Sequence, residues 1–558
     1  MKVTNMDFKQ LSNRICTISG SFVDLRKFNY IYVDKTREIY DLASQRDFFF
    51  LSRPRRFGKS TIVSTLDELF RHGVSPYDGH DSYFKGLAIE NLWSDNEQYR
   101  VFHLDLSTIQ GKPIENAEIY EQELIKKIDD FANDYGLKIN SSSNNVFNHF
   151  ESVLKQISDH SLVFLVDEYD FALTKSIDLP QNFKDITDVL KKLYTALKVY
   201  AIKFRFCFIT GITRYKDSSV FTAGSPINDI SLDDEYGTIT GITKEELTTF
   251  YPDHLKWVAS KQHNKDFDEV TKEDIEETLY EIANWYDGYS FDKNCKTHVF
   301  TTWSILKLFK DKEGAFDTYW YDVGGTPLIL RKSYDKIINN KSLLLNGELE
   351  VPVNVFDNPT AFADMDPRVL LFQTGYLSFY KAKDKSQYYL KFPNKEVYSA
   401  FSDYLLEKAY KQNNEEYSLC YQDKDKLEKA KTIEEIIDYF NEILNLVDYE
   451  HFPLTSEAAV VTCLHIFLKA LDRYQVNVNY HSALGRADLV VDSISRRLVF
   501  EFKYCKDENE DKLLETAKAQ MLEKRYAKTA NAPTTFMAIA AVYDSNKRKL
   551  TKFAEVNY

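Results

Sequence analysis

The sequence predicts an α/β protein with two separate α/β domains, the first of them built on a parallel sheet that helices cover on both faces. Between about residues 30 and 240, short apolar runs alternate with helical patterns. These runs are almost continuously apolar, which is typical of strands buried on both faces of a sheet. From about residue 453, a second and separate α/β pattern begins.

Length and composition limit the classes of protein to consider. A chain of 558 residues suits roughly three or four domains. Its hydrophobic content of 44% and charged content of 28% are those of a folded globular protein. The net charge of -14 and the pI near 5.4 exclude a uniformly basic nucleic-acid coat, although they leave room for a local basic groove.

Cysteine spacing and hydropathy indicate the compartment. The six cysteines lie far apart and form no CxxC pair, which argues against a zinc ribbon or a disulfide framework and fits a reducing environment. The N-terminal residues have no apolar signal core, and no apolar run approaches the length of a membrane span. We therefore expect a cytoplasmic protein that has no membrane contact.

The expected elements follow the chain in four regions. In the first, residues 1–240, the buried strands are FFFLS (48–52), VFHLDL (101–106), LVFLVD (162–167) and FRFCFITG (204–211). Residues 241–330 predict a helical lid or winged-helix-like region, which opens with a capping box at Thr243 and Glu246.

The last two regions complete this order. Residues 331–450 predict a linking region of helices and a hairpin, the hairpin formed by LLFQTGYLSFY and YYLKFPN. Residues 451–558 predict a helix, a strand pair, a second helix and the last strand TTFMAIAAVY.

A first group of motifs indicates nucleotide binding. The run RPRRFGKS ends in Gly58, Lys59 and Ser60, followed by Thr61, and it lies between a buried strand and a helical pattern. A tight turn at this place aims backbone N–H groups at phosphates, the lysine adds a cation, and the serine hydroxyl reaches Mg²⁺. The tripeptide alone is weak evidence, but a strand before it and a helix after it strengthen the prediction.

A second apolar strand ends in Asp167 and Glu168, a pattern that binds Mg²⁺ through its aspartate and activates water through its glutamate. A further strand ends near Thr210 and Thr213, and we expect one of these hydroxyls, Thr210 in the first place, to contact the γ-phosphate. The alternative for the acidic pair is an ordinary strand end. Taken with the upstream loop, the joint pattern favours a nucleotide site.

Arg53 is the residue that departs from the usual phosphate-binding pattern, because it stands where a glycine normally lets the backbone approach the phosphates. With Arg55 and Arg56 it makes the loop strongly cationic. Three arginines would help to hold a polyanion or another acidic partner. The plain alternative is a solvated basic turn.

At this point the motifs resemble a known family. They are YIYVDKTREIYDL, FLSRPRRFGKS, LVFLVDEYD, FITGITRY and ISLDDEYGTITGITKEEL. Together they resemble the AAA-ATPase-like domain of bacterial proteins that carry a fused PD-(D/E)xK nuclease domain, over most of the first 330 residues. The resemblance implies a P-loop NTPase-type sheet that binds ATP through Arg55, Arg56, Gly58, Lys59, Ser60, Thr61, Asp167 and Thr210. It also implies that Arg53 is a family trait, and it leaves ATP hydrolysis open.

A second group of motifs lies near the C-terminus, in the run GRADLVVDSISRRLVFEFK. Strand alternation puts Glu501 and Lys503 on one face. If the preceding turn is centred between residues 494 and 495, Asp488 lies opposite Glu501, and both carboxylates reach one metal ion. A shift of one residue in the turn would separate them.

Two carboxylates and a lysine on one surface suit metal-dependent phosphodiester hydrolysis, since the metal polarises the phosphate and acidifies bound water. The Phe502 carbonyl offers a further ligand. The alternative is an exposed strand face with an ordinary Glu–Lys pair. Glu501 and Lys503 alone favour this alternative, but together with Asp488 and the helix that bears Gln520 they favour the metal site.

This region resembles the core of PD-(D/E)xK nucleases, which have a restriction-endonuclease-like α/β fold. The resemblance implies catalytic roles for Asp488, Glu501 and Lys503. It implies contacts to the site or substrate for Gln520 and Tyr526, and a weaker metal contact for Glu457.

The sequence therefore predicts an ATP-binding, ATP-regulated nuclease that uses Mg²⁺, with Mn²⁺ as an alternative. We expect nucleic acid as its partner, DNA more than RNA, and allow a homo-oligomer. Defence against foreign nucleic acid is an expectation by analogy with fused ATPase–nucleases. The alternative is a nucleotide-dependent switch or scaffold whose nuclease-like domain only binds nucleic acid or a protein.

Overall fold

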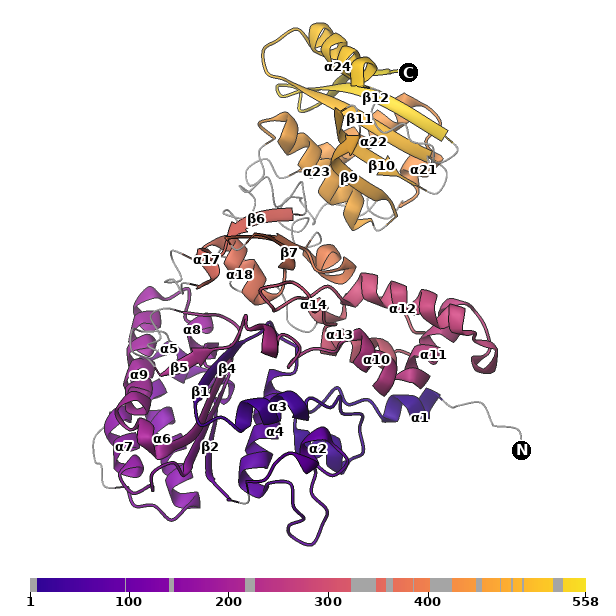
Figure 1. Ribbon diagram of the computed structural model, residues 1–558. Coiled ribbons are helices and arrows are strands. Elements are labelled where there is room, and N and C mark those ends of the chain that lie inside the picture. Colours follow the sequence, from indigo (N-terminus) through magenta and orange to yellow (C-terminus); the bar gives the residue numbers. More distant parts are fainter. Residues whose placement is uncertain are drawn as a thin grey trace. The chain divides into compact units, whose positions relative to one another are not determined.

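The computed structural model describes residues 8–95, 97–139, 145–215, 226–322, 348–357, 365–384, 386–401, 424–447, 454–471, 473–482, 485–493, 496–524 and 535–557 (Figure 1). Contacts divide the chain into two compact units, Met1–Tyr334 with Glu350–Glu396, and Asp335–Leu349 with Val397–Tyr558. Each unit is described by itself. Among the described residues, the helices include none with the length and apolarity that a membrane crossing requires.

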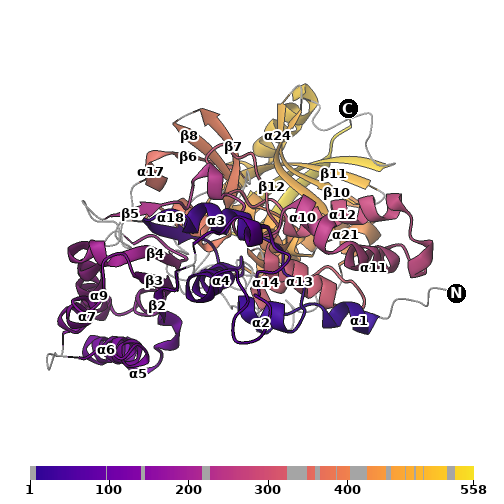
Figure 2. The same ribbon diagram turned by 60° about the horizontal axis from the view of Figure 1, so that its bottom comes forward.

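The first unit contains a five-stranded sheet in the order β2-β3-β4-β1-β5, and all its strand pairs are parallel. In Figure 2 the labelled strands β2, β3, β4 and β5 follow one another in this order. The strands are β1 (Phe48–Ser52), β2 (Arg100–Asp105), β3 (Leu162–Asp167), β4 (Phe204–Gly211) and β5 (Ile227–Asp229). Three of the four expected runs match strands residue for residue, and the fourth, VFHLDL, forms β2 shifted by one residue. This order brings the carboxyl ends of β1, β4 and β3 together.

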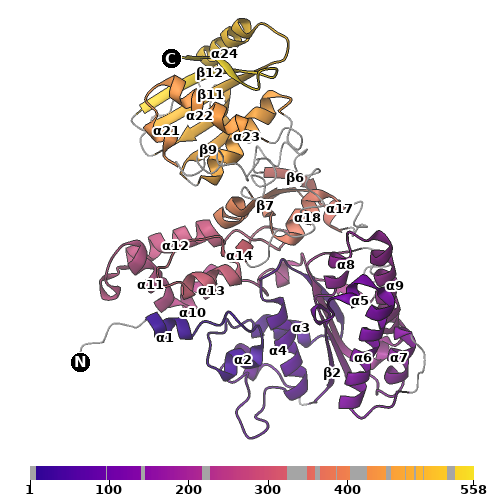
Figure 3. The same cartoon turned by 180° about the vertical axis from the view of Figure 1, so that it is seen from behind.

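Helices cover both faces of this sheet. Side chains of successive strand residues point to opposite faces and pack into two separate hydrophobic cores. Phe48 and Phe50 of β1 pack with α6, α7 and α9, while Phe49 and Leu51 pack with α2, α3 and α4 (Figures 1 and 3). Full burial of each such side chain contributes about 1.5–3 kcal/mol. The helices around the sheet are α2 (Phe22–Lys27), α3 (Thr36–Ala43), α4 (Lys59–His72), α5 (Lys112–Glu115), α6 (Ala117–Asp134), α7 (Val146–Leu154), α8 (Phe171–Lys175) and α9 (Pro180–Val199). The helix α1 (Phe8–Asn13) packs instead against α11 (Pro252–Gln262), where Phe8 stacks on Trp257.

The helical region that follows confirms the expected capping box, since the Thr243 hydroxyl accepts from the Glu246 N–H and the Glu246 carboxylate accepts from the Thr243 N–H. Tyr286, Tyr289 and Phe291 of the run WYDGYSF are buried in a packed turn. The helices are α10 (Lys244–Phe250), α11 (Pro252–Gln262), α12 (Lys272–Tyr286), α13 (Thr302–Lys310) and α14 (Tyr319–Asp322).

The expected hairpin exists, but its first half was predicted wrongly. Residues 370–374 of LLFQTGYLSFY are helical, because Asp366 caps a helix that ends at Gly375 in the left-handed conformation. The hairpin begins only at Ser378 and joins a third strand in the order β6-β8-β7. The elements are β6 (Glu348–Pro352), α17 (Asn354–Asp357), α18 (Pro367–Thr374), β7 (Ser378–Asp384) and β8 (Gln387–Lys391).

The second unit holds a mixed five-stranded sheet in the order β13-β12-β11-β10-β9. Helix α24 packs on one face, over Val499 and Ala540, and Phe440 of α22 contacts Phe500 on the other face. The strands β9 and β13 were not predicted. The elements are α21 (Lys426–Lys429), α22 (Ile433–Asn445), α23 (Glu457–Ala470), β9 (Gln475–Ser482), β10 (Gly485–Asp492), β11 (Arg496–Cys505), α24 (Glu510–Lys524), β12 (Thr535–Asp544) and β13 (Lys549–Glu555).

Candidate functional site

The loop between β1 and α4 has the geometry of a phosphate cradle. Gly58 adopts φ 92° and Arg56 adopts φ 72°, so the chain turns through the left-handed region twice before α4 begins at Lys59. The N–H groups of the first turn of α4 point out of the helix N-terminus, where the helix dipole favours an anion.

Lys59 is buried and its ammonium group turns back onto its own loop. Its Nζ donates to the carbonyl oxygens of Arg53 at 3.1 Å and Pro54 at 3.0 Å. Burial lowers the pKa of Lys59, whereas the carboxylates of Glu168 and Asp167 raise it. The ammonium group is therefore held at the loop by two neutral acceptors, which negatively charged phosphate oxygens can replace.

Arg53 does not belong to the phosphate-facing surface, which corrects the expectation that three arginines hold a polyanion. Its side chain is 1% exposed, and its guanidinium donates to four oxygens. These are the carbonyl oxygens of Ser52 (2.9 Å), Ser231 (2.7 Å) and Tyr236 (2.9 Å) and the Thr240 hydroxyl (3.2 Å). The guanidinium also lies 4.4 Å from the centre of the Phe291 ring. Arg53 thus fastens the loop to the segment that leads into α10.

Arg55 and Arg56 remain as the accessible cations of the loop, and Arg56 is exposed. The backbone of these residues is fixed from the other side by aromatic residues that the sequence reasoning missed. The Trp320 indole N–H donates to the Arg55 carbonyl at 3.2 Å, and the Trp303 backbone N–H donates to the Arg56 carbonyl at 3.3 Å. The Arg56 guanidinium lies 4.3 Å from the Trp303 ring centre.

Asp167 and Glu168 lie beside this loop. Burial raises the pKa of both carboxyl groups, while the neighbouring Ser60 side chain lowers the pKa of Asp167. Glu168 adopts φ 50°, an uncommon conformation for a residue with a side chain, and it lines the cavity described below. Ser60, Asp167 and Glu168 are thus placed together, as the sequence predicted.

Thr210 does not reach this site, because its hydroxyl is buried and donates to the Leu51 carbonyl at 2.7 Å. The Thr213 hydroxyl donates to Asp170 at 2.5 Å. The contact expected between Thr210 and a γ-phosphate is therefore incompatible with this arrangement. Asp170, which sequence reasoning passed over, also accepts from the N–H groups of Ile212 and Thr213 and so joins the ends of β3 and β4.

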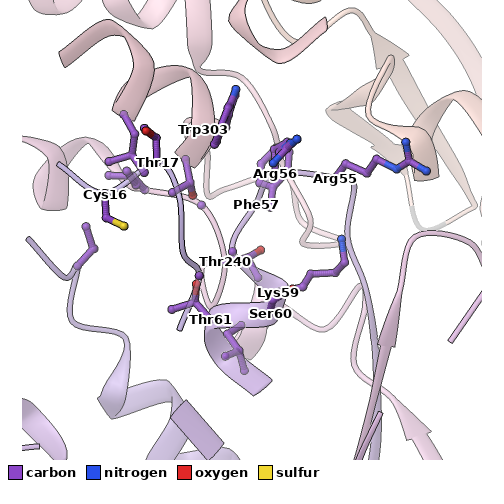
Figure 4. A pocket seen from close by; sticks show the side chains of 18 of the residues that line it. Cys16, Thr17, Arg55, Arg56, Phe57, Lys59, Ser60, Thr61, Thr240 and Trp303 are labelled. Carbon is purple, nitrogen blue, oxygen red and sulfur yellow. The ribbon is translucent and has the colours of Figure 1, made fainter. Parts of the chain in front are cut away.

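A cavity of about 590 Å³ opens over the loop (Figure 4). Its floor includes Lys59, Ser60 and Thr61. Residues 16–20 form part of one wall, and Trp303 and Leu306 of α13 form part of another. A cationic floor under partly apolar walls suits a molecule that has phosphates at one end and a flat apolar group at the other.

The second candidate site lies where β10 and β11 run together. Leu489 pairs with Phe500 and Val490 with Val499. This is the register expected if the turn is centred between residues 494 and 495. The next positions in this register are Asp488 and Glu501. The Phe502 N–H donates to the Asp488 carboxylate at 2.8 Å, which ties the two strands together at the site.

Glu501 is the most constrained group of this site. Its side chain is 1% exposed, its Oε1 accepts from Lys503 Nζ at 2.7 Å, and its buried Oε2 has no hydrogen-bond partner in the described parts of the chain. Burial and the neighbouring Asp488 charge raise the pKa of Glu501 to about 7, although Lys503 opposes the shift. A buried oxygen without a partner is costly, so the site favours an added cation.

Lys503 connects the remaining groups. Its Nζ also donates to the Phe502 carbonyl at 2.9 Å and lies 3.7 Å from the Glu457 carboxylate at the start of α23. Gln520 lies half-buried on α24, next to buried Met521. Tyr526 lies outside the described residues. Four predicted residues, Asp488, Glu501, Lys503 and Glu457, therefore come together.

The residues present fit a divalent metal in part. Asp488, Glu501 and the Phe502 carbonyl supply the hard oxygen ligands that Mg²⁺ and Mn²⁺ prefer. In the part of the chain that the structure describes, no three His, Cys, Asp or Glu side chains already form a metal-binding group. Such an ion would polarise a bound phosphate and acidify its water.

Comparison with known proteins finds a family match for each of the two regions that contain these sites. Residues 17–221 match the family described as "Predicted AAA-ATPase", and residues 455–553 match the PD-(D/E)XK nuclease superfamily. The chain carries an AAA-ATPase-like domain and a PD-(D/E)XK nuclease domain. The AAA-ATPase-like domain contains the loop, Asp167 and Glu168, and the nuclease domain contains Glu457, Asp488, Glu501 and Lys503.

A relative from Azotobacter chroococcum mcd 1, the "Uncharacterized protein in vnfD 5'region", is 27% identical over 392 residues, which are 68% of this chain and 67% of that protein. At the family level, the AAA-ATPase-like and PD-(D/E)XK domains together support a nucleotide-dependent nuclease.

Proposed function

We propose that the protein is an ATP-binding, ATP-regulated and metal-dependent nuclease that hydrolyses phosphodiester bonds of nucleic acid, DNA more than RNA. The observation that carries the proposal is Glu501, a buried carboxylate beside Asp488 with one oxygen that has no hydrogen-bond partner among the described residues. Because a buried carboxylate oxygen without a partner opposes folding, its position is best explained by a cation that binds there during function.

The proposed roles follow from the contacts. Asp488, Glu501 and the Phe502 carbonyl would hold Mg²⁺ or Mn²⁺, with Glu457 as an additional ligand. Lys503, already bound to Glu501 and close to Glu457, would position the attacking water or stabilise the charge that develops on the phosphate. Gln520 on α24 would contact the substrate backbone.

Contacts within the first unit support regulation by ATP. Trp320 contacts the loop through its indole, and its backbone N–H donates to Glu396 at 2.7 Å. The Ser304 hydroxyl donates to the same carboxylate at 2.8 Å, and Glu396 is buried. The longer segment of the second unit, Val397–Tyr558, begins at the next residue. A change in the loop on ATP binding would therefore be transmitted to the peptide that leads into the second unit.

A cleavage assay tests the nuclease. Labelled single- and double-stranded DNA and RNA are incubated with the full chain and Mg²⁺ or Mn²⁺, with and without ATP. Lys503→Ala and Glu501→Gln should abolish cleavage. The exposed pair Glu515 and Lys518 of α24 supplies matched controls, since Glu515→Gln and Lys518→Ala alter a similar ion pair of 2.8 Å elsewhere in the domain. Cleavage that survives Lys503→Ala would refute the assignment.

The same assay tests the regulation. Lys59→Ala should remove the effect of ATP on cleavage, because Lys59 is the buried cation where the loop meets α4. If ATP changes cleavage equally in wild type and Lys59→Ala, the regulatory role of the loop is wrong. Defence against foreign nucleic acid, in the cytoplasm, is the setting we propose by analogy.

A second candidate is a nucleotide-dependent switch whose nuclease domain only binds its partner. The contacts of Lys503 favour it, because an ammonium group beside Glu501 and Glu457 already offsets negative charge without a metal. Titration with Mn²⁺ separates the candidates. Metal binding that Glu501→Gln abolishes supports the nuclease, and absence of metal binding supports the switch.

A further inference from the structure

The hairpin of β7 and β8 has two very different faces. Phe379, Tyr388 and Leu390 are buried, with Phe379 against Phe356 and Phe372. On the other face, Tyr380 and Tyr389 are half-buried and carry their rings toward solvent-accessible lysines.

A β-bulge produces this arrangement. Phe379 pairs with Leu390 but Lys381 pairs with Tyr389, so one extra residue, Tyr380, stands in β7. Bulges turn an additional side chain to the same side of a strand. Tyr380 and Lys381 are consequently both accessible.

Three lysines lie over the two rings. Lys391 Nζ is 3.8 Å from the Tyr380 ring centre, and Lys381 Nζ is 4.6 Å from that of Tyr389. Lys383 Nζ is 6.0 Å from the Tyr389 ring centre and pairs with Glu350 of β6 at 2.6 Å. We call these five residues, Tyr380, Lys381, Lys383, Tyr389 and Lys391, the tyrosine–lysine face.

The charge of this face is opposite to that of the chain. Its described side chains bring three ammonium groups and, from β6, the Glu350 carboxylate. The chain as a whole has a net charge of -14. A ligand that matches the face offers repeated negative charge and flat rings. Single-stranded nucleic acid offers both, because its phosphates suit the lysines and its unpaired bases can stack on tyrosine.

We propose that the tyrosine–lysine face binds single-stranded nucleic acid. In a duplex the bases are stacked on each other, so the two rings would be of little use. The flexible lysine stems let the ammonium groups leave the ring faces for phosphates when bases arrive. The inference rests on the proposed nuclease for its biological meaning, since it names the strandedness of the substrate, but the contact itself is independent of cleavage.

Binding of a fluorescein-labelled 20-mer of deoxythymidine to the full chain, measured by anisotropy in EDTA, tests the proposal. Tyr380→Leu with Tyr389→Leu should weaken binding about tenfold for each ring, because stacking is lost while apolar volume is kept. Tyr380→Phe with Tyr389→Phe keeps the rings and should bind within about twofold of wild type. Tyr280→Ala is the control, since Tyr280 is 67% exposed on α12.

The lysines are tested by salt dependence. Replacement of Lys381, Lys383 and Lys391 by alanine should reduce the slope of log affinity against log salt concentration by about 2, at about 0.7 for each phosphate contact. Lys126→Ala, at an exposed position of α6, should leave the slope unchanged.

Three results would overturn the proposal: wild-type affinity in the leucine variant, equal affinity for a duplex of the same length, or displacement of the 20-mer by polyglutamate at equal charge. The last result would indicate an acidic protein partner instead. If the proposed nuclease function is wrong but the binding proposal is right, the result is different: the wild-type chain binds the 20-mer and does not cut it when metal is present.

Discussion

Replacement of Arg53 by glycine should destabilise the protein, although it brings the loop closer to the usual phosphate-binding pattern. Judged by the general phosphate-loop pattern alone, without the family resemblance, Arg53→Gly restores the expected glycine. Read from the structure, it removes a buried guanidinium that donates to four oxygens. The two readings predict opposite results.

The magnitude follows from the groups left behind. Three carbonyl oxygens and one hydroxyl lose a charged donor, and Phe291 loses the cation over its ring. Burial lowers the pKa of Arg53 to about 9, so the group is charged at neutral pH. Removal of one partner from such a buried network costs about 3–5 kcal/mol. At about 2–4 °C for each kcal/mol, we expect a fall in Tm of at least about 6 °C.

Thermal unfolding with and without ATP measures the effect. The unfolding transition of the first unit is identified as the one whose midpoint temperature rises with ATP, since a ligand stabilises only the folded unit that binds it. Arg53→Met, which keeps most of the volume, should also destabilise. Arg56→Ala is the matched control from the same loop and should change Tm by less than about 2 °C. An unchanged Tm, or tighter ATP binding by Arg53→Gly, would refute the structural role of Arg53.

Three further predictions concern other residues. The folded-state pKa of Glu501, about 7, lies above its ordinary value of 4.5, so ionisation opposes folding. In EDTA the free energy of unfolding should therefore fall by up to about 3 kcal/mol as the pH rises from 4.5 to 7, and denaturant titration of Glu501→Gln should lack this fall. Gly288→Ala should cost more than about 3 kcal/mol, since Gly288 has φ 92° and a Cβ would lie 2.2 Å from the Pro393 carbonyl oxygen. Gly136→Ala, with φ 63° and open space, should cost about 1 kcal/mol in the same denaturant titration. Glu168→Gln should retain bound ATP if Glu168 activates water, and unchanged ATP turnover would exclude that role.

The strands of the first unit were predictable because each is a short apolar run that the sheet buries on both faces. FFFLS and FRFCFITG correspond to β1 and β4 without any shift. β9 and β13 escaped prediction because QVNVNYHS and KLTKFAE mix polar residues into the pattern, as strands at the two edges of a sheet do. The helix at 367–374 was missed because its apolar run, LLF, fits a strand equally well.

In the candidate sites too, features that depend on residues close in sequence were predictable, and contacts with residues far away in the chain were not. For β10 and β11 the sequence predicted a conditional register, which would place Asp488 opposite Glu501 if the turn were centred between residues 494 and 495, and the observed strand pairing agrees with that condition. The direction of the Arg53 side chain did not follow, because its acceptors at Ser231 and Tyr236 lie 178 and 183 residues away in the chain. The predicted phosphate contact of Thr210 was wrong for a similar reason, since its hydroxyl donates to Leu51 on a neighbouring strand that is distant in sequence.

The indole groups at the phosphate loop give the protein an internal optical reporter. Of five tryptophans, Trp303 and Trp320 line the cavity, and the Trp320 indole N–H is bonded directly to the loop. Indole emission depends on the polarity and charge around the ring, so arrival of a triphosphate beside these two residues should alter the intrinsic fluorescence of the unlabelled chain. Loading of the cavity can then be followed in real time during turnover, with Trp320→Phe to assign the signal.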